Sequence, residues 1–355
     1  MATVVENSKS LESEQSSAAG GGGDKGTSSS HAASSAERRE MRGGVTALAN
    51  LKIAKMAKSI VIPMLGIIGF LALWAMLAPQ VDTALGSLPG PVEVGGQGVA
   101  LFEEWSATQA AKAAFYEAQE TRNAATIAAG NPVQNFEYSG SPTFLDQIWT
   151  SLMTVALGFF LATIVAVPIG LVCGLSKTIN TAINPLIQIM KPVSPLAWLP
   201  IVTMVISATM TNPDPTLPKS FVISAIVVML CSLWTTLINT AVGTASIDRD
   251  LLNVGRVLRL GWFAKLTRLV LPSALPYIFT GMRLSLGVGW MVLIAAEMLA
   301  QNPGLGKFVW DEFQNGSSQS LARIMFAVIV IGLIGFMLDR MMMLLENFVS
   351  RNRAA

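Results

Sequence analysis

Long apolar stretches dominate this sequence and restrict the folds that are open to it. Six of them recur along the chain, at residues 59–79, 148–175, 196–210, 220–242, 275–300 and 321–349. Most are long enough to cross the ~30 Å hydrocarbon core of a bilayer as a helix, at about 1.5 Å per residue. The third is short, with Pro192 and Pro195 before it and Pro200 inside it, so we expect a broken start. The sequence therefore predicts an all-α integral membrane protein with six transmembrane helices.

The composition supports a membrane protein and argues against several other classes. Charged residues make up only 13% of the chain, whereas a soluble chain would be about one-quarter charged. The net charge of +2 gives no indication of a nucleic-acid partner, because in a membrane protein the location of charges matters more than their sum. The single histidine, His31, lies in a low-complexity tail, and no nucleotide-binding, nucleophile or metal-ligand motif is present. We therefore expect no catalytic residues, no metal and no cofactor bound by this chain.

Basic residues gather on one side of the six-span pattern. Residues 1–45 are rich in Ser and Gly and are predicted to be a disordered tail, and 46–80 combine a basic flank with the first transmembrane helix. Cytoplasmic loops carry an excess of Lys and Arg, so this flank and the basic C-terminus predict that both termini are cytoplasmic. Lys219 and Lys307 are exceptions on the opposite side.

An acidic insert at residues 81–146 separates the first span from the other five. It holds eight acidic residues but only Lys112 and Arg122 as bases, which indicates the periplasmic side. Residues 99–129 are rich in Ala and Glu and are predicted to be helical. This helix either packs over the bundle in solvent or at the membrane surface, or offers a docking surface to a periplasmic partner. Residues 147–350 form the predicted core domain with five transmembrane helices.

A polar loop at residues 244–276 joins two spans on the cytoplasmic side. Leu251, Val254 and Leu258 follow helical spacing, while polar and basic residues fall mainly on the other side. We expect two short helices, one on either side of Gly261. An amphipathic helix at this place needs a receiver for its apolar face, which is either the lipid headgroup region or a partner protein.

The order of residues in this loop resembles a known signature, EAA-x3-G-x9-I-x-LP. The corresponding positions are Asn253, Val254, Gly255, Arg259, Leu269, Leu271 and Pro272. The signature marks the permease subunits of ATP-binding-cassette importers, which favours a partner protein as the receiver. Asn253 stands where the pattern has Glu, and Arg259 where it has the Gly that permits a turn between the two helices. We expect Gly261, two residues later, to make that turn.

Other segments resemble the nitrate/sulfonate/taurine group of these permeases, closest to the nitrate branch. They are residues 191–201, 276–285, 295–298, 302–306 and 309–313. The resemblance covers about residues 55–350. It implies the type I ABC importer permease fold, a place in the bacterial inner membrane and translocation of nitrate. Nitrite, bicarbonate, cyanate and alkanesulfonates such as taurine are the alternative substrates.

The resemblance also implies the partners and the mechanism. Two separate ATP-binding-cassette ATPase subunits would hold ATP and Mg and bind the cytoplasmic face, so this chain is a transport permease and not an enzyme. A periplasmic or lipid-anchored binding protein would deliver the substrate, and two permease copies would form a homodimer that works by alternating access. A secondary transporter is the competing class, but the inverted repeats and charged midplane residues typical of that class were not detected.

Eight loop residues are candidates for coupling to the ATPase. Gly255 would allow close seating in an ATPase groove. Leu251 and Leu258 would supply apolar contact, and Arg256 and Arg259 would pair with acids at the rim of the groove. The full set is Asp250, Leu251, Asn253, Gly255, Arg256, Leu258, Arg259 and Gly261.

Seven further residues are candidates for the translocation pathway or a gate: Ser151, Thr154, Pro195, Trp198, Trp290, Glu297 and Arg323. Glu297 lies near the outer end of a span, where it either pairs with an Arg or a helix N-terminus or acts in gating. Arg323 is either an anion attractor or a snorkelling anchor, and Pro195 is part of a gate or only starts a helix. Arg283, about two turns inside the fifth span, is interpreted as snorkelling.

Overall fold

The computed structural model describes residues 61–83, 86–211 and 217–351. The predicted disordered tail, residues 1–45, lies outside the described residues. The chain divides into two compact units, residues 1–72 and 73–355. Within the first unit, the described residues 61–72 are helical and belong to the apolar candidate span Val61–Gln80, which matches the first expected transmembrane helix.

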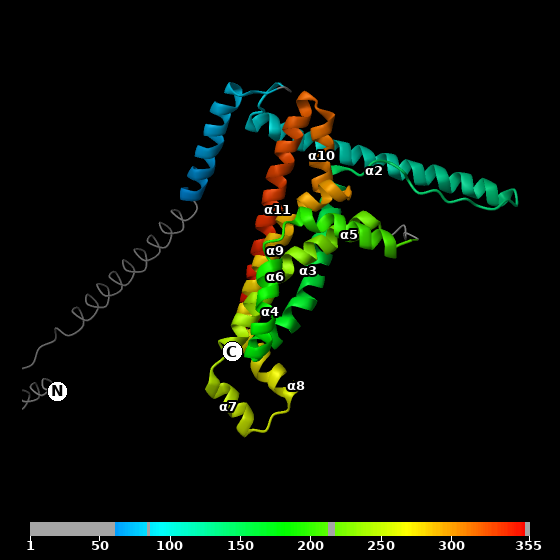
Figure 1. Ribbon diagram of the computed structural model, residues 1–355. Helices are drawn as coiled ribbons and strands as arrows, with labels where there is room; N and C mark the ends of the chain where they lie inside the picture. Colours follow the sequence, from blue (N-terminus) through cyan, green and yellow to red (C-terminus); the bar gives the residue numbers. More distant parts are fainter. Residues whose placement is uncertain (1–60, 84–85, 212–216, 352–355) are drawn as a thin grey trace, which may run out of the picture. The chain divides into compact units, whose positions relative to one another are not determined.

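The described part of the second unit is almost entirely helical (Figure 1). A short antiparallel pair of strands, with Asp82 opposite Ser87, precedes its long helices. In chain order the elements are η1 Ala78–Gln80, β1 Asp82–Thr83, β2 Gly86–Ser87, α2 Pro91–Ala128, α3 Phe144–Leu175, α4 Lys177–Met190, α5 Pro195–Thr209, α6 Lys219–Ala245, α7 Arg249–Val257, α8 Trp262–Lys265, the π-helical turn η2 Leu266–Val270, α9 Leu271–Ala300, α10 Leu305–Asn315 and α11 Ser318–Arg351.

The described residues contain five helices long and apolar enough to cross a membrane, or six if α4 and α5 are one broken span. α4 and α5 meet at an angle of 99°. Ser194 caps α5 through its hydroxyl, and Pro195 opens the first turn, where its missing N–H does no harm. The expected all-α membrane fold is confirmed, and the third span has the broken start that its prolines predicted.

Three helices, α3, α6 and α9, form the centre of the bundle, with α6 packed along both of the others. Glycines permit the close approach. A Cβ added at Gly158 of α3 would lie 2.6 Å from the Ala225 carbonyl oxygen of α6, and one at Gly281 of α9 would lie 2.7 Å from the Asn239 Cβ. Small residues bring helix backbones together in this way where lipid gives no hydrophobic drive for association.

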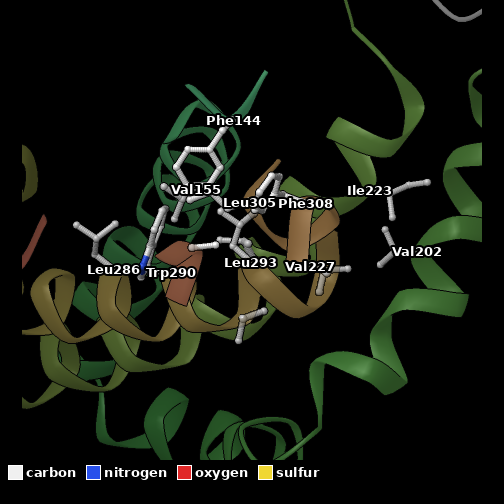
Figure 2. Packing of buried hydrophobic residues seen from close by; sticks show 14 of the residues in the cluster. Phe144, Val155, Val202, Ile223, Val227, Leu286, Trp290, Leu293, Leu305 and Phe308 are labelled. Carbon is white, nitrogen blue, oxygen red and sulfur yellow. The ribbon is translucent and has the colours of Figure 1, made fainter. Parts of the chain in front are cut away.

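The apolar core joins this centre to α10 and α11. Phe144 of α3 meets Phe308 of α10 edge-on, with ring centres 4.8 Å apart, and Leu293 and Leu305 belong to the same cluster (Figure 2). α10 is therefore a packed part of the core domain, although it is too short to span a bilayer.

The insert contains the predicted helix, which begins at Pro91 instead of near residue 99. α2 packs against α11, where Gly98 lies under the Phe326 ring. The chain after α2 then returns along this helix. The Phe136 N–H donates a hydrogen bond to the Gln119 side chain at 3.0 Å. Most other α2 side chains are exposed.

Candidate functional site

The polar loop contains a helical segment on either side of Gly261, as expected: α7, and α8, which continues through η2 into α9. α7 begins at Arg249 because the Asp248 carboxylate caps it, accepting the Asp250 N–H at 3.0 Å. It ends in two hydrogen bonds of 3.0 Å, from Arg259 N–H to the Arg256 carbonyl and from Leu260 N–H to the Gly255 carbonyl. This pair of bonds is the Schellman arrangement, which requires a left-handed residue just after the helix.

Arg259 supplies that left-handed residue, with φ of 49°. Gly261 has φ of −60°, an ordinary value, and stands at the N-cap of α8. The expectation that Gly261 makes the turn was therefore wrong. The hydrogen bonds that close α7 fix the turn at position 259, and Arg accepts the left-handed conformation there at a cost of about 1 kcal/mol. The usual glycine of the signature would avoid that cost.

Gly255 is buried inside the loop and does not face outward. A Cβ added there would lie 2.7 Å from Cδ1 of Leu269, in η2. The two ends of the signature, Gly255 and the Leu269-x-Leu271-Pro272 stretch, therefore pack against each other within one chain. This contact explains the need for a small residue at position 255 and corrects the expectation that Gly255 itself is seated in a partner's groove.

Large apolar side chains are exposed on α7 and α8. We call them the exposed apolar set: Leu251, Val254, Val257, Leu258, Trp262 and Phe263. Exposed apolar groups gathered on one short loop mark an interaction surface. Sequence reasoning selected only Leu251 and Leu258 as contacts. Trp262 and Phe263 were missed because α8 is too short to show periodicity, although two aromatics after a glycine could have indicated them.

The polar coupling candidates surround this set. Asp250, Asn253, Arg256 and Arg259 are exposed, and no side-chain hydrogen bond or ion pair holds any of them within the described residues. They are therefore available to groups on another molecule.

A buried polar cluster joins three elements near the C-terminal end of α9. Glu297 is fully buried, and the Ser151 hydroxyl of α3 lies 2.8 Å from both of its carboxylate oxygens. The Gly306 N–H donates to the same carboxylate at 2.9 Å, and the Leu305 N–H donates to the Ser151 hydroxyl at 2.8 Å. The carboxylate thus lies at the N-terminus of α10, where the helix dipole favours a negative charge. Of the two interpretations of Glu297, its pairing with a helix N-terminus is what the structure shows.

Thr154 belongs to the same cluster, accepting a hydrogen bond from the Asn302 side chain at 3.2 Å. Trp290 is also buried, and its ring N–H donates to the Ile331 carbonyl of α11 at 3.0 Å. Ser151, Thr154, Trp290 and Glu297 are therefore buried and hydrogen-bonded within this chain.

The remaining pathway candidates lie apart from this cluster. Trp198 borders an apolar pocket of about 200 Å³ between α5 and α6. Pro195 opens α5, as described above. Arg323 forms ion pairs with Glu104 of α2 and, at 3.2 Å, with Glu312 of α10. Arg323 therefore ties three elements together, and neither earlier interpretation, a free anion attractor or a snorkelling anchor, describes it.

A second charged site was missed by sequence reasoning. Arg283 of α9 does not snorkel but forms a two-pronged ion pair with Asp339 of α11, Nε to Oδ1 at 2.5 Å and Nη2 to Oδ2 at 3.0 Å. The pair borders a cavity of about 570 Å³ whose lining also includes Thr280, Met291 and Glu346. The signal was present in the sequence, since an Arg and an Asp inside two apolar spans are expensive unless they meet.

Comparison with known proteins places these features in context. The family model described as binding-protein-dependent transport system inner membrane component matches residues 166–351. The nitrate import permease protein NrtB of Synechococcus elongatus is 36% identical over 204 residues, 58% of this chain and 69% of the relative. The bicarbonate transport system permease protein CmpB of the same organism is 32% identical over 316 residues, 89% of this chain and 98% of the relative. Among solved structures, the MetNI methionine ABC transporter in inward-facing conformations matches 58% of this chain and 95% of its own, with 11% identity and a TM-score of 0.49.

Proposed function

Because the chain belongs to the family of inner-membrane components of binding-protein-dependent transport systems, we propose that it carries nitrate across the bacterial inner membrane as the permease subunit of an ATP-driven importer. The chain is a permease of the ABC importer type and not an enzyme. The nitrate assignment is supported by the nitrate permease relative and by the segments, such as residues 302–306, that resemble the nitrate branch.

Bicarbonate is the second candidate substrate. It is favoured by the bicarbonate permease relative, whose match extends over 89% of this chain and so takes in much of the insert. Nitrate and bicarbonate are both small, planar, singly charged oxyanions. A membrane pathway suited to one is therefore suited in shape and charge to the other, and the binding protein would supply much of the selection between them.

The observation that carries the mechanism is the exposed apolar set on α7 and α8, next to Arg256 and Arg259, which form no ion pair with other described residues. We propose that a groove on each ATPase subunit receives these residues. Movement of α7 would reach the membrane through the Gly255–Leu269 contact, because η2 continues directly into α9. Closure of two ATPase subunits would then turn the cavity of a permease homodimer outward to the binding protein, and hydrolysis would return it inward.

Uptake by the reconstituted transporter tests the substrate. The chain, purified with the ATPase and binding protein that function with it, is placed in proteoliposomes and offered labelled nitrate, bicarbonate or taurine. We expect nitrate accumulation that requires both ATP and the binding protein. Bicarbonate accumulation without nitrate would replace nitrate by the second candidate. Transport of taurine alone, or of none of the three, would contradict the proposal.

A further inference from the structure

One face of α9 is left open by the described residues of the second unit, 73–351. Its opposite face packs on α3 and α6, whereas Thr280, Leu284, Gly287 and Met291 are exposed. Arg283 lies on the open side, about two turns inside the predicted fifth span, residues 275–300. A charge at that depth is expensive in contact with lipid. The cavity beside Arg283 is therefore better suited to water and ions than to acyl chains.

The Arg283–Asp339 pair is poorly placed to serve only as a structural ion pair that stabilises the packing of α9 against α11. About one-third of each side chain is exposed, 35% for Arg283 and 39% for Asp339. Ion pairs that are exposed to water to this extent contribute little to stability. Apolar contacts and the Trp290 hydrogen bond already hold the same two helices together. The need of charges inside apolar spans to meet explains why the two residues pair, but their exposure to the cavity needs a further explanation.

Its geometry supplies one. The guanidinium of Arg283 presents Nε and Nη2 as a planar fork, and both atoms bond the Asp339 carboxylate. This fork matches planar groups with two oxygens side by side, which is why Arg binds carboxylates in a two-pronged manner. Nitrate and bicarbonate are planar and carry the same pair of oxygens. Asp339 therefore occupies a site whose shape and charge also fit the proposed substrates.

We propose that Arg283 is an anion-binding residue of the translocation pathway and that Asp339 is its internal competitor. The inference rests on the proposed function. When α9 and α11 shift during the transport cycle, the planar oxyanion replaces Asp339 on the Arg283 fork, and the return of Asp339 then displaces it. Such exchange keeps binding weak enough for release, which any conducting site requires.

A second acidic group in the cavity lining also favours weak binding and release of the anion. Glu346 is seven residues beyond Asp339, two helical turns closer to the C-terminal end of α11, and borders the same cavity. Its negative charge opposes a long stay of an anion beside it. Arg340 does not join the Arg283 fork, because its guanidinium lies over the Phe336 ring, 4.8 Å from the ring centre.

Exchanging the two charged residues distinguishes an anion-binding site from a purely structural ion pair. The double variant R283D/D339R keeps an ion pair between α9 and α11 but moves the guanidinium to the other helix. We expect the thermal unfolding midpoint of the complex to stay near that of the wild type, while nitrate uptake falls at least about tenfold, the equivalent of one lost charged hydrogen bond. The matched control is K307D/D311K, which exchanges the Lys307–Asp311 pair within α10 and should leave uptake unchanged.

Direct binding of nitrate to single variants is a second measurement. It does not depend on whether the double variant folds. Labelled nitrate is measured on the purified complex of permease and ATPase without the binding protein. Asp339→Asn should retain more nitrate than the wild type, because the competitor is weakened, and Arg283→Gln should retain less. Wild-type nitrate binding and uptake in both single variants would overturn the inference, as would full uptake by the double variant. If the wild-type complex transports neither nitrate nor bicarbonate, the proposed function fails together with this inference. If the wild type transports nitrate but the variants behave like it, only the inference fails.

Discussion

Replacing Val257 with aspartate should release the ATPase subunits from the complex while leaving the permease folded in the membrane. Val257 is 81% exposed, so the chain itself loses almost no packing when the side chain changes. In the proposed complex the same position enters an apolar groove, where an unpaired carboxylate costs several kcal/mol. A loss of that size weakens binding by at least about a hundredfold. Co-purification of the ATPase with tagged permease measures the effect directly.

The matched control makes the same kind of change outside the loop. Ile127 of α2 is 64% exposed, and Ile127→Asp also adds a carboxylate to the surface. This variant should retain the ATPase fully, while Val257→Asp should lose both the ATPase and ATP-driven uptake. Full ATPase retention and uptake by Val257→Asp would show that the exposed apolar set does not receive the partner.

Replacing Glu297 with alanine should destabilise the core domain. The carboxylate accepts hydrogen bonds from the buried Ser151 hydroxyl and the Gly306 N–H, and alanine leaves both donors without their acceptor. Each such donor costs about 1–3 kcal/mol, so we expect a loss of roughly 2–6 kcal/mol for the two and a clear fall in the thermal unfolding midpoint. Glu297→Gln, which keeps one acceptor oxygen, should fall between the wild type and Glu297→Ala.

We expect the Glu297→Ala substitution to loosen the structure locally, at the junction of α9 and α10. Loss of the carboxylate frees the N-terminus of α10, so protease should cut between α9 and α10 sooner in Glu297→Ala than in the wild type. Glu103→Ala removes an exposed carboxylate from α2 and is the matched control, expected to leave the unfolding midpoint unchanged. Equal midpoints for Glu297→Ala and the control would contradict the role assigned to this cluster.

The fold was largely predictable because membrane helices are defined by length and apolarity, which one sequence displays. The broken third span followed from its prolines in the same way. α4 and α10 were not predicted as helices. Their apolar residues, such as Ile183 and Ile187 in α4, cover only one face, and their burial depends on neighbours that the sequence does not specify.

The candidate site was less predictable because it depends on which helical faces meet. Ser151 and Glu297 are 146 residues apart in the chain and touch only because α3 and α9 pack together. Arg283 and Asp339 are separated by 56 residues, and their contact likewise depends on which faces of α9 and α11 meet. The turn at Arg259 was missed for another reason. The α7 hydrogen bonds decide which residue is left-handed, and glycine content alone does not.

Cross-linking from α7 tests most directly whether this loop is where the ATPase acts. A photo-reactive residue is placed at position 257 in a complex that still transports nitrate, with the same residue at position 127 as the comparison. The proposed mechanism predicts a covalent adduct between position 257 and the ATPase subunit, with a yield that differs between the ATP-bound and nucleotide-free states, and no such adduct from position 127. A transporting complex in which position 257 never cross-links to the ATPase would contradict it.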